Sequence, residues 1–214
     1  MQFFLPFIFG FMAAVVGIIP PGLINLTAAK ISLIDGKKTA MKFVFGALTV
    51  IIVQTFISVF FAQYINRNQE IIILIREIGL VIFVILSIYF LKFAKKTAEI
   101  SEAPKVIKTK RSRFLIGMLV SAINFFPIPY YVLISITLAS YNLFKFELLQ
   151  EILFVFGVLF GSSIVFYLYV VFFNKMKSKA DYFITNMNKM IGTITGIVAL
   201  FTLFHLLKMY FNGR

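Results

Sequence analysis

The 214-residue sequence contains no cysteine, no tryptophan and a single histidine, His205. Without cysteine the chain can form neither a disulfide nor a thiolate metal site, and one histidine leaves little scope for zinc or haem. We therefore expect no cofactor and no metal. Acidic residues are also scarce, because eight Asp and Glu stand against 21 Lys and Arg, and the net charge is +13.

Apolar residues make up 61% of the chain, and the mean hydropathy is +0.98. A soluble domain of this length cannot bury so much apolar surface. The apolar residues fall in runs of about 20 or more, long enough for a membrane helix, and the charges lie between the runs. In such a protein the positive charge belongs to cytoplasmic loops, so we expect contact with membrane lipid and no binding of nucleic acid.

The pattern predicts an all-α integral membrane protein with six transmembrane helices, at residues 3–33, 41–63, 71–93, 114–143, 147–173 and 190–211. A basic loop at 94–113 separates a first three-span repeat, 1–93, from a second one, 114–214, within a single membrane domain. Three is an odd number, so the second half enters the membrane in the opposite sense. The predicted fold is therefore two inverted three-helix repeats.

Basic residues are concentrated in alternate connections, which sets the orientation. The connections after the first, third and fifth spans contain Lys37, Lys38, Lys42, Lys95, Lys96, Lys105, Lys108, Lys110, Arg111, Arg113, Lys175, Lys177, Lys179 and Lys189. The other side contains Arg67, Arg76, Lys145, Lys208 and Arg214. Cytoplasmic loops collect Lys and Arg. We therefore expect the long loop in the cytoplasm, both termini outside, and a location in the bacterial cytoplasmic (inner) membrane.

Proline interrupts the first and fourth spans, as Pro20-Pro21-Gly22 and as Pro127-Ile128-Pro129. Each proline removes an N–H and leaves the carbonyl four residues earlier without its helical donor. The affected carbonyls would be those of Val16, Gly17, Ile123 and Phe125. Within hydrocarbon such groups are tolerated only against protein or a water-filled cavity. A half-helix that starts near Gly22 would also present unpaired amides at a positive dipole end.

We therefore predict a substrate site at the two breaks, where amides take a carboxylate and carbonyls take an ammonium. The predicted substrate-binding residues are Gly17, Pro20, Pro21, Gly22, Asn25, Gln54, Asn124, Pro127, Pro129 and Tyr130. Two alternatives stay open: the prolines could be plain kinks, and the three amides could bridge helices instead of lining a pathway. No acidic residue is expected at mid-membrane, which favours a neutral amino acid, or an apolar metabolite with one carboxylate, over a cation.

At these breaks the chain resembles the lysine exporter (LysE/RhtB) family of amino-acid exporters. The resemblance is carried by Pro21-Gly22, Gly36-Lys37-Lys38, Gly46-Ala47, and Gly117 seven residues before Asn124. The sequence departs from the family pattern at Leu23, where the family has a second proline, and at Asn25, which comes one place late. The resemblance implies a secondary transporter, not an enzyme, that exports amino acids or related metabolites and is driven by the proton gradient.

Two other function classes remain as alternatives. A membrane scaffold or assembly protein would need no matched breaks, and an intramembrane serine hydrolase would use Ser162 or Ser163 with His205. Close helix contacts are expected at Gly157-x-x-x-Gly161 and Gly192-x-x-x-Gly196, within the bundle or in a homodimer. The deciding observation is whether the two breaks, at 20–25 and 124–129, face each other across a mid-membrane cavity. Breaks that face lipid or packed helix would count against the transporter.

Overall fold

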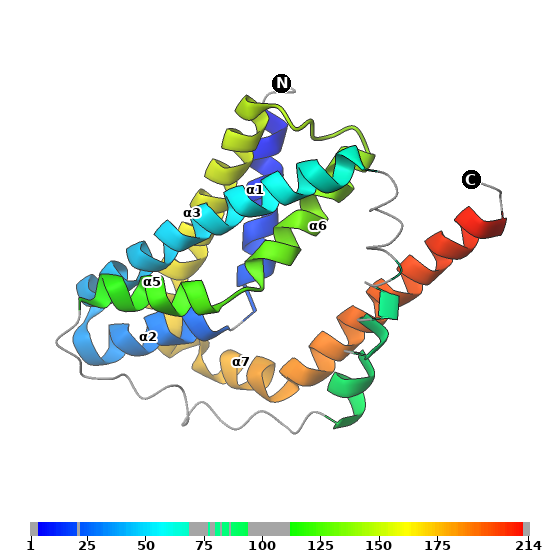
Figure 1. Ribbon diagram of the computed structural model, residues 1–214. Helices are drawn as coiled ribbons and strands as arrows, with labels where there is room; N and C mark the ends of the chain where they lie inside the picture. The colour runs from blue at the N-terminus through cyan, green and yellow to red at the C-terminus, as the bar shows by residue number, and fades with distance from the viewer. Residues whose placement is uncertain are drawn as a thin grey trace. The chain divides into compact units, whose positions relative to one another are not determined.

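The structure is a computed structural model that describes residues 4–20, 22–68, 77, 80–81, 83–85, 87–93 and 112–211. All regular structure in these ranges is helical (Figure 1). The elements are α1 (Leu5–Ile18), α2 (Leu23–Asp35), α3 (Lys37–Arg67), the π-helical turn η2 (Tyr89–Phe93), α5 (Arg113–Ile123), α6 (Pro127–Ser140) and α7 (Leu148–Phe211). The predicted all-α class is confirmed, and part of the predicted third span (71–76, 78–79, 82 and 86) lies outside the described residues.

Two stretches among the described residues are long and apolar enough to cross a membrane alone, α3 and the Leu148–Phe172 part of α7. The pair of α1 and α2 passes the same test only when taken together, with a bend of 72° between the two helices. The pair of α5 and α6 passes it with a bend of 61°. The prediction that the first and fourth helices are broken is therefore confirmed, and the described residues hold two to four spans.

The last two predicted spans lie on one continuous helix, α7. The sequence predicts separate spans joined by a polar connection at residues 174–189, and the structure differs because this connection is itself helical. The stretch from Ser162 to Ile191 contains neither glycine nor proline, the two residues that most often end a helix. Polarity alone does not stop a helix.

The chain divides into two compact units. The first consists of Met1–Asn66 with Ala103–Lys177, and the second of Arg67–Glu102 with Ser178–Arg214. The first unit contains both helix breaks. The two units are groups of residues that contact one another. The predicted halves, 1–93 and 114–214, are instead related by an internal repeat, so the division into units does not test them.

Within the second unit, the predicted glycine motif makes a close helix contact. A Cβ on Gly192 would lie 2.7 Å from Cγ of Leu91, and a Cβ on Gly196 would lie 2.8 Å from Oγ of Ser87. Ser87 also donates a hydrogen bond of 2.9 Å to the Gly192 carbonyl. The packing role expected for this motif is confirmed.

Within the first unit, two pairs of helices cross with their backbones in contact. A Cβ on Gly46 of α3 would collide with the carbonyl oxygen of Phe114 on α5, and a Cβ on Gly117 would collide with that of Phe43. Helices α1 and α7 cross in the same way, where a Cβ on Gly10 would collide with the Phe154 carbonyl. Small residues let helices approach this closely in a membrane.

The other partner in the α1–α7 crossing is the predicted motif at Gly157 and Gly161. A Cβ on Gly157 would collide with the Phe7 carbonyl, and one on Gly161 would lie 2.7 Å from the Phe11 carbonyl. Both glycines are therefore needed for helix contact inside this unit, as the sequence predicts.

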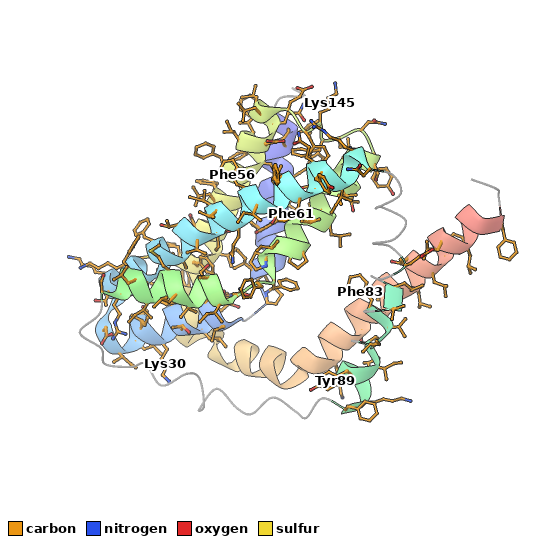
Figure 2. All side chains as sticks on the ribbon, in the orientation of Figure 1. Lys30, Phe56, Phe61, Phe83, Tyr89 and Lys145 are labelled. Carbon is orange, nitrogen blue, oxygen red and sulfur yellow. The ribbon has the colours of Figure 1, made fainter. Side chains whose placement is uncertain are left out.

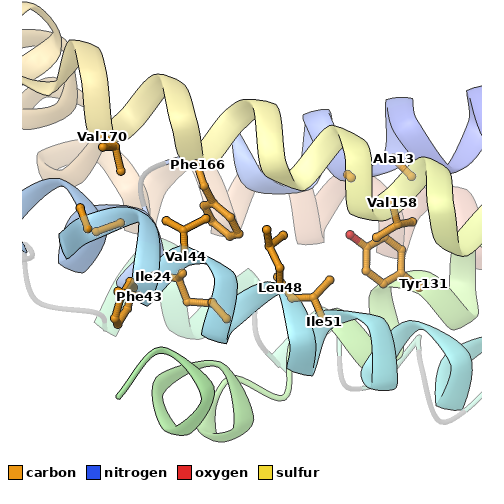
Figure 3. Packing of buried hydrophobic residues seen from close by; sticks show 14 of the residues in the cluster. Ala13, Ile24, Phe43, Val44, Leu48, Ile51, Tyr131, Val158, Phe166 and Val170 are labelled. Carbon is orange, nitrogen blue, oxygen red and sulfur yellow. The ribbon is translucent and has the colours of Figure 1, made fainter. Parts of the chain in front are cut away.

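A core of buried apolar side chains fills the space between α3 and the first part of α7 (Figure 3). Val44 and Leu48 come from α3 and Phe166 from α7, and all three are at most 5% exposed. Charged residues lie at the ends of the unit: Lys30 and Lys145 are at opposite ends, while Phe56 of α3 lies between them (Figure 2). This distribution is typical of a membrane bundle.

Replacing Gly46 or Gly117 by alanine should destabilise the protein, because the added methyl group meets backbone that cannot move alone. Overpacking costs about 1–3 kcal/mol, which corresponds to roughly 2–12 °C for a chain of this size. The melting temperature of the detergent-solubilised protein would measure this loss. Gly22→Ala is the matched control, since no atom lies within 4 Å of its Cβ position. Equal melting temperatures for all three variants would contradict the backbone contact.

Candidate functional site

The first break leaves the start of α2 uncapped. Helix α1 ends at Ile18 and α2 begins at Leu23, with Gly22 extended at φ −117° and ψ 178° as its N-cap residue. The first helical bond at this end runs from Leu26 N–H to the Gly22 carbonyl at 3.0 Å. The amides before Leu26 have no acceptor within their own helix, and Gly22 has no side chain to cap them. Pro21 lies outside the described residues.

Side chains take the carbonyls at the end of α1. The amide nitrogen of Asn25 donates to the carbonyls of Ile18 at 2.6 Å and Pro20 at 3.1 Å. The hydroxyl of Tyr169, on α7, donates to the Ile19 carbonyl at 2.7 Å. Asn25 is 4% exposed. Of the two roles left open for Asn25, the structure therefore favours the structural one, and these carbonyls are already engaged by protein donors.

The second break differs from the first because its helix start has few amides to offer. Helix α5 ends at Ile123 and α6 begins at Pro127. Pro127 and Pro129 have no N–H, and the N–H of Ile128 is bonded to the Phe125 carbonyl at 3.2 Å. The Phe125 carbonyl, expected to be freed by Pro129, is thus satisfied by a tight turn at the start of α6.

Gln54 of α3 spans the second break. Its amide nitrogen donates to the carbonyls of Ser121 at 3.1 Å and Asn124 at 2.9 Å. Because both partners are acceptors, the nitrogen must face them, and the side-chain oxygen Oε1 points elsewhere. That oxygen is buried and has no hydrogen-bond partner in the structure, and the same holds for Oγ of Ser121. Gln54 therefore bridges helices while keeping an unused acceptor.

The two breaks lie side by side. A Cβ on Gly17, in the last turn of α1, would lie 3.0 Å from Cε1 of Tyr130, in the first turn of α6. The Tyr130 hydroxyl donates to the Ala13 carbonyl at 2.9 Å, and its ring stacks on Phe126 with centroids 5.8 Å apart. The structure thus brings the last turn of α1 and the first turn of α6 into contact next to the breaks.

Two residues at the breaks were not predicted from the sequence. Tyr169 and Ser121 sit in ordinary apolar runs, and nothing in their neighbours marks them. Only the fold brings Tyr169 to Ile19 and Ser121 to Gln54. Buried polar residues within an apolar run are a weak signal that applies to many positions in this chain.

The hydrolase alternative finds no supporting geometry. Ser163 donates its hydroxyl to the Leu159 carbonyl of its own helix at 2.7 Å, and Ser162 is fully buried without a partner. His205 belongs to the second unit, and its side chain lies outside the described residues. Over the described part of the chain, no three His, Asp or Glu residues gather as metal ligands would.

A family model described as LysE type translocator matches residues 15–207. The match covers both breaks, the last turn of α1, all of α2, α3, α5 and α6, and α7 up to residue 207. The chain belongs to the LysE type translocator family. LysE type translocators are integral membrane transporters of amino acids or related compounds, and they are not enzymes. No curated protein and no solved structure matches this translocator.

Asn25→Asp should destabilise the translocator in a pH-dependent way. An ionised carboxylate would face the two carbonyls that the Asn25 amide now bonds, whereas a protonated carboxyl can still donate to one of them. We expect a lower melting temperature than wild type at pH 8 and partial recovery at pH 5. Thr27→Val is the control, since that hydroxyl bonds only to Leu23 of its own helix. A melting temperature for Asn25→Asp that equals wild type at both pH values would contradict the capping role.

Proposed function

We propose that this translocator is a secondary transporter that exports a neutral amino acid, or a related small metabolite, through a site formed by its two helix breaks. The observation that carries the proposal is the contact between Gly17 and Tyr130, which joins the breaks. One break offers uncapped amides at Gly22, and the other offers unused acceptors at Gln54 and Ser121. Discontinuous helices of this kind hold the substrate in many secondary transporters.

The inverted repeat is part of the proposal, and the glycine crossings support it. Helix α1 meets α7 through the same kind of contact with which α5 meets α3. The matched residues of the broken helices are Phe7, Gly10, Phe11 and Pro20 in the first half, and Phe114, Gly117, Met118 and Pro127 in the second. Within this set every second-half residue follows its counterpart by the same number of positions.

The partner helices match in the same way. In α3 the contact residues are Phe43, Gly46 and Ala47, and in α7 they are Phe154, Gly157 and Val158, again with one constant spacing. A two-fold relation between two halves of opposite orientation accounts for both sets of matched residues together. Without such a relation, the four close glycine contacts and the matching proline position would have to coincide by chance.

Charge supports a neutral substrate and the proposed orientation. Helix α3 contains no acidic residue, and Leu148–Phe172 contains one, Glu151, in its first turn. A cationic side chain would therefore find no carboxylate partway along these spans.

Asp35, at the end of α2, pairs with Arg113, at the start of α5, so both ends lie on one side. We place that Lys- and Arg-rich side in the cytoplasm of a bacterial inner membrane, with both termini outside, and we propose proton coupling.

Purified protein in proteoliposomes should exchange labelled neutral amino acids in counterflow, and deletion of the gene should raise their retention in cells. A panel of labelled neutral amino acids and dipeptides would identify the substrate, and varying the pH gradient would test coupling. Empty liposomes are the control for leakage. Unchanged efflux of every compound on deletion, with no counterflow, would rule out the exporter proposal.

Gly22→Leu should abolish transport without preventing membrane insertion. Among the described residues, no atom other than those of the chain neighbours lies within 4 Å of the Gly22 Cβ position. A leucine can therefore begin there without a clash at Cβ, and its bulk is expected to obstruct the amide end of α2. We expect at least a tenfold drop in the initial rate of counterflow, with normal yield of monodisperse protein. Gly22→Ala should retain more activity than Gly22→Leu. Wild-type transport by Gly22→Leu would place the substrate elsewhere.

A further inference from the structure

We propose that Gln54 Oε1 and Ser121 Oγ form an acceptor site for the ammonium group of the substrate, at the second break. The inference rests on the proposed function, and it assigns a different end of the substrate to each break. The uncapped amides of α2 would take the carboxylate, as helix starts do. The substrate class is therefore a primary amine that also carries a carboxylate, in preference to a hydroxy acid.

The first observation is the unused oxygen of Gln54. The residue is 4% exposed, and both carbonyls that fix its amide nitrogen belong to the second break, at Ser121 and Asn124. Its Oε1 is sealed from solvent and receives no hydrogen bond. Leaving a buried acceptor unpaired is unfavourable. An N–H donor from outside the chain would correct this.

The second observation is the hydroxyl of Ser121, which, like those of Ser135 and Ser162, has no partner among the described residues, whereas other Ser and Thr hydroxyls in these helices bond to backbone carbonyls. Six of them donate to the carbonyl four residues earlier, namely those of Thr27, Thr49, Thr55, Ser58, Thr137 and Ser163. The Ser121 hydroxyl is fully buried and makes no such bond. Since the Gln54 nitrogen is bonded to the Ser121 carbonyl, the two residues meet between α3 and α5.

The third observation is that packing does not require these polar groups. The spacing that matches the crossing residues of α5 to those of α1 also matches Ser121 to Ala14. The spacing that matches α3 to α7 matches Gln54 to Val165. Ala14 is fully buried and Val165 is 4% exposed. The related crossing of α1 and α7 is therefore built with apolar side chains at these positions. The polar pair is present at one break only. The Gln54 nitrogen serves the fold by bonding the carbonyls of Ser121 and Asn124, but the related crossing shows that packing itself requires neither Gln54 Oε1 nor Ser121 Oγ.

The chemistry of this break favours a donor over an anion. Gln54 Oε1 can only accept, and the start of α6 supplies no free amide at Pro127, Ile128 or Pro129. A carboxylate would find one hydroxyl donor here, whereas an ammonium finds two acceptors. Both oxygens are closed to solvent in this conformation, as the site of an alternating-access transporter is during part of its cycle.

Counterflow in proteoliposomes with L-leucine and 2-hydroxy-4-methylpentanoate, which carries a hydroxyl in place of the ammonium, tests the proposal. Wild type should prefer leucine. Ser121→Ala should raise the half-saturation concentration for leucine about tenfold or more and change that for the hydroxy acid less than about twofold. Gln54→Met should shift the preference in the same direction. Ser135→Ala is the matched control, because Ser135 is equally buried and unpartnered but lies about two turns into α6.

The possible results separate this inference from the proposed function. Leucine transport by Ser121→Ala with an unchanged half-saturation concentration would overturn the acceptor site and leave the transporter proposal standing. Failure of wild type to transport leucine, the hydroxy acid and the wider amino-acid panel would overturn both. If Ser121→Ala is not monodisperse, Ser121→Cys replaces it, because cysteine is similar in size to serine and its sulfur is a weaker acceptor. If Ser121→Cys and Gln54→Met both prefer leucine over the hydroxy acid as strongly as wild type does, the acceptor site is also rejected.

Discussion

The need to satisfy every backbone carbonyl inside a membrane governs the arrangement of this bundle. Hydrocarbon offers no donor, so a helix can be broken only where other protein groups replace the missing N–H. Asn25 and Tyr169 do this at the first break, and Gln54 does it at the second. Since Tyr169 and Gln54 come from neighbouring spans, each broken helix is held in place by an unbroken one. The glycine crossings bring those spans close enough for the bonds to form.

Much of this could be predicted from the sequence where the cause is local. Proline lacks an N–H wherever it stands, so the breaks at Pro20 and Pro127 follow from residue type. Tyr169 could not be identified, because its partner Ile19 is 150 residues away in the chain. The prediction of two separate spans in α7 is wrong for a local reason, because polar residues do not end a helix, and the connection at 174–189 contains neither glycine nor proline.

The two breaks differ chemically although the helix crossings beside them use matched residues. The crossings of α1 with α7 and of α5 with α3 use matched residues, yet one break has amides without acceptors and the other has acceptors without donors. A zwitterion has the complementary distribution of charge. Each break follows a glycine crossing of the same kind, and a few side chains and prolines make the two breaks chemically different.

The distance along the chain from crossing to break is the same in both halves, since ten positions separate Gly10 from Pro20 and Gly117 from Pro127. One inserted residue would turn the break by about 100° around the helix axis and shift it by about 1.5 Å. The break would then face away from its partner, although every residue type would be conserved. Insertions and deletions in homologous chains should therefore be excluded from these two intervals and tolerated in the loop that joins the halves.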